Sequence, residues 1–532
     1  MKLPPGVRDW LPAELERKRA VESAIRGVCE RRGYREVQTP GFERADVLEA
    51  GLGDTLAEKT FRFHDRRGDL IALRSEMTTP IARLVSTRLR GSSLPLRLSY
   101  VAPGYRYEEP QEGRMCEFTQ AGCELIGAQG FDADAEALFM AFEVFDAVGL
   151  RDARFDVNHA AIIDGVLDGL GLNAVAARTA KHLIAARNVV ELKAFVAQHA
   201  QGAGDLNILV ELALLRGDAR VLDVARRVCR TPASLEGIAR LADLLRRAGE
   251  LGYGERIAID FALLRDFEYY TGLVFEGYVG EVGLSLCGGG RYDRLLPRFG
   301  FDAPAVGWMA GVERLLIALE RRKTHDKLVI AVPKGALYAD ARARLASAGI
   351  VVPEDTGRML TVDSADGSAR ILLLRPTDVP AYVEFGAADC GIVGKDVLWE
   401  TDRSVSELAD LGFGPCRLVV AAQRAAGYHE GAALPTFLRV ATKFVRCAES
   451  YFAERDLPVQ IIPLHGSVEL SPIVGLADLI VDLVATGKTL RDHDMVIVDE
   501  IAPSTARFVV NPIRFRVKYD AITALLERLV SA

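Results

Sequence analysis

The sequence predicts several α/β and α+β domains in one chain, and three observations lead to this fold class. From residue 328 to the C-terminus, strand patterns alternate with helical patterns, which favours a mostly parallel sheet with helices on both faces. Residues 1–150 and 255–320 mix the two patterns, whereas residues 158–252 are rich in Ala, Leu and Arg at helical spacing. The length of 532 residues suffices for more than two domains, at roughly 150 residues each.

A short charged run marks the boundary between the two halves. Residues 320–327, ERRKTHDK, follow an apolar helical pattern that ends at Leu319 and precede an apolar strand pattern that begins at Leu328. Such a run is typical of a solvated helix end or a linker. We therefore predict a first domain over 1–320 with a helical insertion over about 158–252, a linker over 321–327 and a second domain over 328–532.

The composition is that of a globular protein and argues against several functional classes. No apolar run approaches the roughly 18 residues of a membrane-spanning helix, and the N-terminus lacks the apolar core of a signal peptide. The net charge of −7 argues against a dedicated nucleic-acid surface. The eight cysteines and eight histidines are scattered without a Cys-x-x-Cys pair, which indicates a reducing cytoplasm and neither a disulfide framework nor a protein-held metal.

The stretch most informative for chemistry is LIVDLVATGKTL, residues 479–490. Its β-branched start predicts a buried strand that runs through an acid into a Thr/Gly-rich loop. Backbone N–H groups of such a loop bind phosphate, and an acid at the strand end accepts hydrogen bonds from sugar hydroxyls. This combination suits a phosphorylated ribose, and its candidate residues are Asp482, Ala485, Thr486, Gly487, Lys488, Thr489 and Leu490.

A nucleotide P-loop is a competing interpretation of the same stretch. Gly487, Lys488 and Thr489 match the end of that motif, but the motif needs a glycine five residues before Gly487. That position is Asp482, so the P-loop is rejected. On this stretch alone, a chance TGKT in an ordinary loop is the other alternative.

Six ordered motifs after residue 327 resemble the short form of ATP phosphoribosyltransferase. They are LVIAVPKGAL (328–337), LLRPTDVPAYVEFGAADCGIVGKDVL (373–398), LGFGPCRLVVA (411–421), RVATKF (439–444), HGSVELSPIVGLADLIVDLVATGKTL (465–490) and ARFVVNP (506–512). The resemblance implies two α/β lobes flanking a cleft, like a periplasmic binding protein. It also implies the first step of histidine biosynthesis, in which ATP and phosphoribosyl pyrophosphate give phosphoribosyl-ATP and pyrophosphate.

This reaction needs cations more than it needs a general base. Adenine N1 has a lone pair to attack the sugar, while a multiply anionic group leaves a cationic ribose, so preorganised cations and Mg²⁺ are expected to contribute most. Relatives have arginine where this chain has Ala336, so one cation is missing there or another residue supplies it.

The candidate catalytic residues follow from this need. They are Lys334, Arg358 and Arg375 for the phosphates, and Glu469 and Asp482 for ribose hydroxyls or a metal-bound water. An ordinary surface charge is the alternative for Lys334 and Arg375. Asp378, three residues after Arg375, is predicted to cap the following helix rather than to orient that arginine.

The first half resembles the catalytic core of histidyl-tRNA synthetase, a class II synthetase. The motifs are PPGVRDWLP near the N-terminus, LRSEMTTPIAR (73–83), YRYEEPQEGRMCEFTQAGCELIG (105–127), LLRDFEYYTGLVFE (263–276), and GGGRYDRLLPRFG with PAVGWMAGVERL within 288–315. The resemblance implies an antiparallel-sheet core of the class II synthetase kind, interrupted by the helical insertion.

The residue types of this half suit free histidine as a ligand. Two glutamates and a glutamine accept hydrogen bonds from an ammonium or a ring N–H, an arginine binds a carboxylate, and tyrosines form an aromatic wall with polar tips. The candidate residues of this regulatory site are Glu76, Gln120, Glu124, Arg265, Tyr269 and Tyr270. The alternative is a vestigial cleft that these side chains merely fill.

Departures from the synthetase favour a regulatory relative that does not charge tRNA. The transferase half stands where the synthetase carries its anticodon-binding domain. Cys116 and Thr119 replace a basic residue and a histidine, and Asp266 and Glu268 replace a glycine and an aspartate. This pattern resembles the regulatory subunit of ATP phosphoribosyltransferase, a synthetase paralogue that partners the short catalytic form.

The two resemblances together predict a fusion of the regulatory and catalytic subunits. ATP and phosphoribosyl pyrophosphate are the expected substrates, L-histidine the expected inhibitor and Mg²⁺ the expected cofactor, while tRNA and membranes are not expected partners. Arg106 and Arg314 keep positions that grip ATP in the synthetase, so nucleotide binding to the first half stays open. Both parent families self-associate, so a closed homo-oligomer is expected, by analogy a tetramer.

Two other interpretations stay open. One is a histidyl-tRNA synthetase-like protein with an unusual C-terminal domain that binds a small anion, and tRNA aminoacylation would identify it. The other is a sensor whose second half only binds an anion, and pyrophosphate release from both substrates would exclude it.

Overall fold

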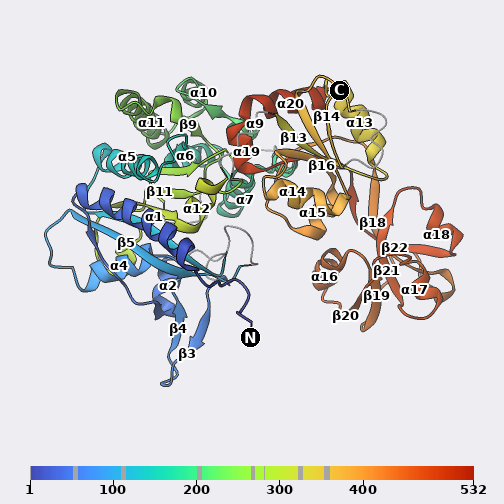
Figure 1. Cartoon of the computed structure of the whole chain (residues 1–532). Coiled ribbons are helices and arrows are strands. Elements are labelled where there is room, and N and C mark those ends of the chain that lie inside the picture. Colours follow the sequence, from blue (N-terminus) through green and yellow to red (C-terminus); the bar gives the residue numbers. More distant parts are fainter. Residues whose placement is uncertain are drawn as a thin grey trace. The chain divides into compact units, whose positions relative to one another are not determined.

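The computed structural model describes residues 2–51, 58–108, 115–199, 206–264, 270–280, 282–321, 327–352 and 360–531. The chain divides into two compact units, Met1–Thr324 and His325–Ala532 (Figure 1). Arg265, Tyr269 and Arg358, together with most of the predicted linker, lie outside the described residues. No helix in the described part of the chain is long and apolar enough to cross a membrane.

The first unit is organised around one large sheet whose central strands are antiparallel. Among the described residues of this sheet, only the pairs β1·β5 and β7·β9 are parallel. The nine strands follow in space as β1 (Arg35–Glu36), β5 (Leu96–Tyr105), β6 (Glu117–Ile126), β12 (Ala305–Gly311), β11 (Cys287–Arg291), β10 (Leu273–Tyr278), β7 (Arg154–His159), β9 (Ile257–Asp260) and β8 (Arg216–Gly217). The antiparallel core agrees with the predicted synthetase-like fold.

Different elements cover the two faces of this sheet. One face packs against α1 (Pro12–Arg31), α5 (Phe131–Ala147) and α12 (Val312–Glu320) in the main hydrophobic core. The other face packs against α4 (Thr78–Thr87) and the short 3-10 helix η2 (Leu296–Phe299). A separate three-stranded sheet of β2 (Phe42–Arg44), β4 (Leu70–Leu73) and β3 (Arg62–His64) adjoins α2 (Ala45–Gly51).

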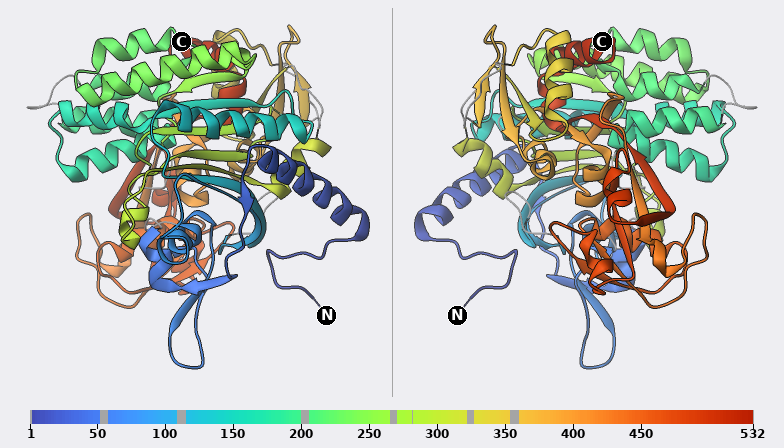
Figure 2. Two further views of the ribbon diagram at one scale, coloured as in Figure 1. Left: turned by 90° about the vertical axis from the view of Figure 1, so that its left-hand side faces the viewer. Right: turned by 90° about the vertical axis from the view of Figure 1, so that its right-hand side faces the viewer.

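The predicted insertion over 158–252 corresponds to a group of helices between β7 and β9 (Figure 2, green). They are α6 (Ala160–Gly169), α7 (Ala174–Ala186), α8 (Val189–His199), α9 (Asn207–Leu214), α10 (Val221–Val228) and α11 (Pro232–Glu250), followed by η1 (Gly254–Arg256). A buried ion pair, Arg216 with Asp156 at 2.7 Å, ties the insertion to the sheet, and Tyr278 donates a hydrogen bond to the same carboxylate. A second buried pair joins Arg187 to Asp260.

The second unit contains two sheets, and both are mixed. The first has the order β14 (Thr361–Asp363), β15 (Ala369–Leu374), β13 (Leu328–Pro333), β16 (Cys390–Gly394), β23 (Ala506–Val510), β17 (Ser406–Asp410). The second has the order β20 (Val459–Pro463), β19 (Leu438–Thr442), β21 (Leu479–Val484), β18 (Cys416–Gln423), β22 (Met495–Ser504).

The prediction of a mostly parallel sheet in this half was wrong in detail. Parallel pairs surround β13 and β19, but β14, β17, β18, β22 and β23 all pair antiparallel. The chain crosses from the first sheet to the second after β17 and returns between β22 and β23, and each crossing brings antiparallel strands together. The helices are α13 (Tyr338–Ser347), α14 (Val379–Glu384), α15 (Lys395–Thr401), α16 (Val445–Ala453), α17 (Leu470–Ile473), α18 (Lys488–Asp492), α19 (Pro512–Val517) and α20 (Tyr519–Ser531), with 3-10 turns η3 (Pro376–Asp378) and η4 (Arg424–Ala426).

Candidate ligand pocket and transferase site

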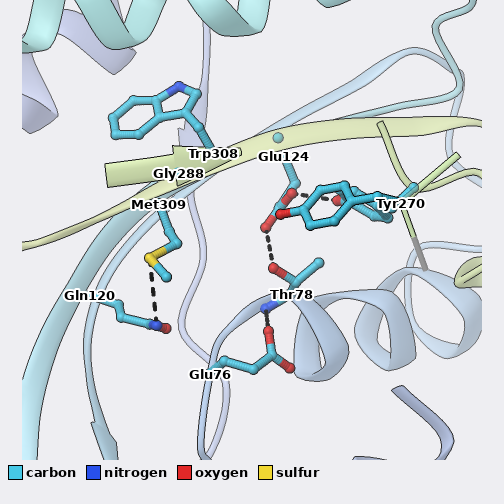
Figure 3. Close-up of a pocket in the computed structure, with 10 residues that line it drawn as sticks. Glu76, Thr78, Gln120, Glu124, Tyr270, Gly288, Trp308 and Met309 are labelled. Atoms are coloured by element: carbon cyan, nitrogen blue, oxygen red, sulfur yellow. Dashed lines mark hydrogen bonds between the residues drawn. The ribbon is translucent and has the colours of Figure 1, made fainter. Parts of the chain in front are cut away.

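A pocket lies on the α4 face of the large sheet in the first unit (Figure 3). About 350 Å³ of empty space, part of it open to solvent, lies between its lining residues. Its described lining residues are Glu76, Thr78, Gln120, Glu124, Tyr270, Gly288, Tyr292, Gly307, Trp308 and Met309. Four of the six residues predicted to form a histidine site, namely Glu76, Gln120, Glu124 and Tyr270, therefore line one cavity.

Strand alternation explains why Gln120 and Glu124 reach this pocket. Successive side chains of a strand point to opposite faces. Ala121, Cys123 and Leu125 of β6 belong to the helix-covered core, so the residues between them face α4. The same alternation on β12 buries the Trp308 ring in the helix-covered core, and Figure 3 shows it on the other side of the strands from Glu124.

Glu124 is the most deeply buried acid of the pocket, with 1% of its surface exposed. One carboxylate oxygen accepts a hydrogen bond from the Thr78 hydroxyl at 2.9 Å, and the other accepts one from the Tyr292 hydroxyl. Burial raises the pKa of Glu124 to about 8, because desolvation outweighs these hydrogen bonds and the nearby Glu76 carboxylate adds to the rise. In the empty pocket this carboxyl is therefore mostly protonated at neutral pH.

Glu76 and Gln120 complete the polar lining. Glu76 accepts hydrogen bonds from the backbone N–H groups of Thr78 and Thr79 at 2.5 and 2.9 Å, so it also fixes the start of α4. A carboxylate has room for further donors beyond these two. Gln120 is 2% exposed, its amide N–H contacts the Met309 sulfur at 3.7 Å, and its amide oxygen has no hydrogen-bond partner in the described part of the chain.

Glycines form part of the pocket wall because side chains approach the backbone closely there. A Cβ added at Gly307, which lies opposite Glu124 on β12, would stand 1.9 Å from a Glu124 carboxylate oxygen. A Cβ added at Gly290 would stand 2.7 Å from the Tyr270 ring. Glycine is therefore required at these two positions, because a side chain there would overlap the side chains that line the pocket.

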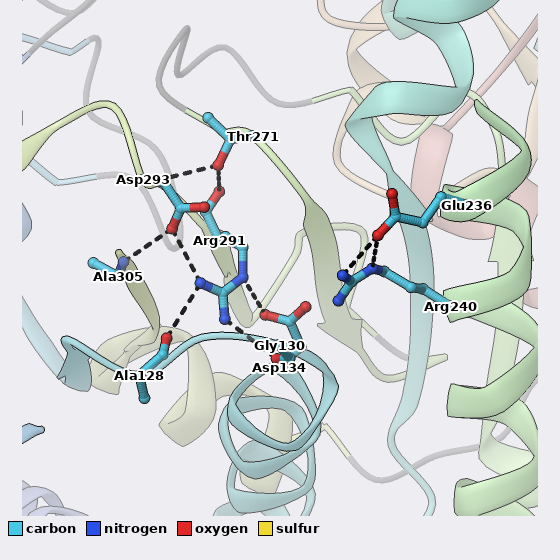
Figure 4. A network of polar contacts seen from close by, with 9 residues as sticks. All are labelled: Ala128, Gly130, Asp134, Glu236, Arg240, Thr271, Arg291, Asp293 and Ala305. Atoms are coloured by element: carbon cyan, nitrogen blue, oxygen red, sulfur yellow. Dashed lines mark hydrogen bonds and ion pairs between the residues drawn. The ribbon is translucent and has the colours of Figure 1, made fainter. Parts of the chain in front are cut away.

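A buried arginine network holds the segment that carries Tyr270 (Figure 4). Arg291, at the end of β11, donates to Asp134 at 2.7 Å and to Asp293 at 3.0 Å. The neighbour of Tyr270, Thr271, donates its N–H to the Arg291 carbonyl at 2.8 Å, and its hydroxyl accepts the Asp293 N–H at 3.1 Å. Tyr270 is therefore positioned from outside the pocket.

Sequence reasoning missed Thr78, Tyr292 and Met309. Thr78 and Tyr292 belong to the quoted motifs TTPIAR and GGGRYDR, but their meeting at Glu124 depends on tertiary contacts. The two arginines expected to grip ATP make protein contacts as well. Arg106 donates to the Ser75 carbonyl at 2.8 Å, and Arg314 donates to the Ser285 carbonyl at 2.8 Å.

In the second unit, the end of β21 joins an acid to a lysine that was not predicted. Thr442 of β19 pairs with Val481 of β21 in parallel register, so the next residues, Lys443 and Asp482, are neighbours. They form an ion pair at 3.0 Å, and the side chains are 44% and 20% exposed. The motif RVATKF contained this lysine, but only the strand pairing shows that it lies beside the acid.

The predicted loop over 485–490 is shorter than expected. Ala485, Thr486 and Gly487 form the loop, whereas α18 begins at Lys488. Gly487 has φ of +68°, a left-handed conformation that favours glycine at this turn. Lys488 and Thr489 are exposed in the first turn of the helix, but Leu490 is buried among Val484 and Val468, so only its backbone is available to a ligand.

A second pair of neighbouring strand ends carries two of the predicted cations. Pro333 of β13 pairs with Leu374 of β15 in parallel register, and the Lys334 N–H donates to the Leu374 carbonyl at 2.7 Å. Lys334 and Arg375 therefore leave the same edge of the first sheet side by side.

Two further residues are placed by short helices. Glu469 precedes α17, and its neighbour Val468 packs with Leu490 in the cluster that also contains Val484, next to the loop at Ala485–Gly487. Asp378 stands at the N-cap position of α14 without making a side-chain cap, so the prediction that it caps this helix was wrong. Its neighbour Thr377 donates a hydroxyl hydrogen bond to it at 3.4 Å.

Comparisons with known proteins identify the family of the first unit. The family model of histidyl-tRNA synthetase matches residues 6–315. The ATP phosphoribosyltransferase regulatory subunit of Moorella thermoacetica is 42% identical over 60% of this chain and 82% of the relative. That of Geobacter sulfurreducens is 40% identical over 62% of this chain and 76% of the relative. A crystal structure of an ATP phosphoribosyltransferase regulatory subunit/histidyl-tRNA synthetase from Bacillus halodurans is 28% identical, with a TM-score of 0.56 over 70% of this chain and 92% of that chain.

The second unit has its own match. The family model of ATP phosphoribosyltransferase covers residues 375–531, which include the Lys443–Asp482 pair and the loop at Ala485–Gly487. The chain therefore belongs, through residues 6–315, to the histidyl-tRNA synthetase family and its ATP phosphoribosyltransferase regulatory subunits, and it continues into an ATP phosphoribosyltransferase domain, the enzyme of histidine biosynthesis that this regulatory half accompanies.

Proposed function

We propose that the second unit transfers phosphoribosyl from phosphoribosyl pyrophosphate to N1 of ATP, and that the first unit binds L-histidine and inhibits this transfer. The observation that carries the catalytic half is the loop after β21, with Asp482 and Lys443 beside it, inside the segment that matches the transferase family. Ligands of α/β sheets bind outside the carboxyl ends of parallel strands, which is where this pair and Lys334 with Arg375 lie.

The two sheets of the second unit are proposed to form two lobes around a cleft, as in periplasmic binding proteins. Each sheet then contributes one strand-end pair. The loop at Ala485–Gly487 and the first turn of α18 take the 5′-phosphate, and Asp482 takes ribose hydroxyls. Lys334 and Arg375 bind the pyrophosphate or the phosphates of ATP, and Arg358 and Glu469 are proposed to assist them.

Charge dictates what these residues contribute to the reaction. The sugar becomes cationic and pyrophosphate leaves as an anion, so fixed cations stabilise the transition state most. Lys443 is a candidate for the cation that Ala336 does not supply, because it stands beside the ribose acid.

Mg²⁺ is proposed as a cofactor that arrives with the phosphates. In the described part of the chain, no three His, Cys, Asp or Glu side chains are grouped so as to hold a metal. The exposed carboxylates near the loop fit this arrangement, because Mg²⁺ keeps several waters and binds through one or two carboxylates plus substrate phosphates. The metal would neutralise charge on the leaving pyrophosphate.

Histidine is proposed as the ligand of the pocket in the first unit. Glu76, Glu124 and the Gln120 oxygen are acceptors for its ammonium or ring N–H, and Tyr270 forms a wall. Arg265 and Tyr269 are kept as proposed ligands from the sequence. We also propose that tRNA is not charged, that the chain acts as a homo-oligomer, with a tetramer as the specific expectation, and that it works in the cytoplasm.

The test is release of pyrophosphate by the purified full chain supplied with ATP, phosphoribosyl pyrophosphate and Mg²⁺, with and without histidine. Turnover that needs both substrates and falls with histidine supports the proposal. Turnover absent under all conditions would reject the catalytic half, and full turnover at saturating histidine would reject the regulatory half. Histidylation of tRNA by the same preparation would favour the synthetase-like alternative instead.

A further inference from the structure

The histidine pocket has an unusual balance of charge among its described lining residues. They include two carboxylates, Glu76 and Glu124, and no lysine, arginine or histidine. The groups that face Glu124 from the neighbouring elements are Tyr100 on β5, Thr78 on α4, Tyr292 after β11, and the Glu76 carboxylate. None of these groups supplies a positive charge.

Three acceptors converge on this space. The Gln120 amide oxygen is buried and has no partner in the described part of the chain, and Figure 3 shows the amide on the same side as Glu76 and Glu124. Burying an unpartnered oxygen is costly unless a ligand donates to it. An ammonium has three donors and no acceptor, so it matches this set better than any neutral group does.

Two carboxylates in one closed pocket do not both ionise without a counter-charge. Glu124 is the more buried of the two carboxylates, because Gly307, which has no side chain, lets the backbone of β12 approach the Glu124 carboxylate directly. Burial raises the pKa of Glu124 to about 8, so the Glu124 carboxyl is mostly protonated at neutral pH when no ligand is bound.

We propose that Glu124 gives up this proton to the solvent when the ammonium group of histidine binds, so that histidine binding tightens as the pH rises from 6.5 to 7.5. The inference rests on the proposed function, because it takes histidine as the ligand. The ammonium replaces the proton as the positive charge beside Glu124. Release of one proton per ligand makes the dissociation constant fall about tenfold per pH unit below the pKa of the free carboxyl.

Calorimetric titration of the full chain with L-histidine tests this directly. At pH 7.0 the binding enthalpy is measured in phosphate and in Tris, whose ionisation enthalpies differ, so that the difference gives the number of protons released. We expect close to one proton for the unchanged chain and none for Glu124→Gln, which keeps the shape but does not titrate. Glu30→Gln, which removes an exposed carboxylate of α1 outside the pocket, is the matched control and should still release the proton.

A ligand without the ammonium gives a second control. Imidazole propionate has the ring and the carboxylate of histidine, and its binding to the unchanged chain should release no proton.

Equal binding enthalpies in the two buffers for the unchanged chain would overturn the inference, as would proton release that persists in Glu124→Gln or vanishes in Glu30→Gln. If Glu124→Gln binds no histidine, the buffer comparison on the unchanged chain and on Glu30→Gln still decides. Absence of histidine binding to the unchanged chain at every pH would overturn the proposed function itself, which is a different result from binding without proton release.

Discussion

The pocket of the first unit and the strand-end site of the second unit differ in how far their charged groups are buried. The pocket is enclosed, and its acids are held by hydrogen bonds from hydroxyl and backbone groups before any ligand arrives. The Lys443–Asp482 pair is partly exposed and lies where a loop meets a helix. If the pocket is regulatory as proposed, burial gives it selectivity, whereas the proposed phosphate site needs cations that stay hydrated until the substrate replaces the water.

The largest effect is expected from adding one methyl group to the wall of the enclosed pocket. Gly307→Ala places a Cβ 1.9 Å from the Glu124 carboxylate and 2.5 Å from the Cys123 carbonyl, so one of them must move. We expect histidine binding to be lost and the unit to be destabilised by about 1–3 kcal/mol, as for overpacking elsewhere. Calorimetry and thermal unfolding measure both. Gly91→Ala, where nothing lies within 4 Å, is the control, and equal behaviour of the two variants would contradict the assigned geometry.

Substrate binding at the partly exposed site of the second unit should be weakened by removing polar or charged groups rather than by filling space. Asp482→Asn and Thr489→Ala are each expected to raise KM for phosphoribosyl pyrophosphate about tenfold or more while changing KM for ATP little, since a charge-assisted contact contributes about 1.5–3 kcal/mol. Steady-state kinetics with each substrate varied in turn provide the measurement. Asp478→Asn removes a comparable ion pair, Arg439–Asp478 at 2.8 Å, from the other end of β21 and should leave both values unchanged. Equal loss for both substrates would reject this loop as the phosphoribosyl site.

Coupling between the two sites is expected to be of intermediate size. Tyr270→Ala and Glu124→Ala should raise the histidine concentration needed for half inhibition at least tenfold, because each removes a contact to the ligand, and a tenfold loss of affinity corresponds to about 1.4 kcal/mol. Inhibition curves of pyrophosphate release provide the measurement, with Phe63→Ala, an exposed aromatic on β3, as the matched control. Unchanged potency in both variants would place the histidine site elsewhere, for which the junction of the two halves is the rival.

A further effect concerns how the stability of the first unit without ligand depends on pH. Because the pKa of Glu124 is raised from 4.5 to about 8, the folded chain keeps a proton between these pH values that the unfolded chain has released. The folded state is therefore penalised increasingly as the pH rises through this window, by about 1.4 kcal/mol per unit. Glu124→Gln removes this penalty. The midpoint of thermal unfolding of Glu124→Gln, relative to that of the unchanged chain, should therefore rise from pH 5 to pH 8. A constant difference across this range would show that Glu124 is ionised in the folded state.

The difference between the two sites also explains what the sequence could predict. Gln120 and Glu124 could be assigned to one face because strand alternation is local, and four proposed histidine ligands do line one pocket. The contact of Tyr292 with Glu124 could not be predicted, since it joins residues far apart in the chain. Lys443 was overlooked for the same reason, because its pairing with Asp482 requires the register of β19 and β21. The start of α18 at Lys488 was missed because a glycine in a left-handed turn ends a loop as readily as it extends one.

The return of the chain from the second sheet to the first has a consequence for biosynthesis. The five-stranded sheet is built from residues 416–504, a continuous segment, whereas the six-stranded sheet places β23 (Ala506–Val510) between β16 and β17. A sheet cannot close before all its strands exist. During translation the inserted sheet can therefore form while its host still lacks an internal strand, and the six-stranded sheet is completed only after Val510 has been made.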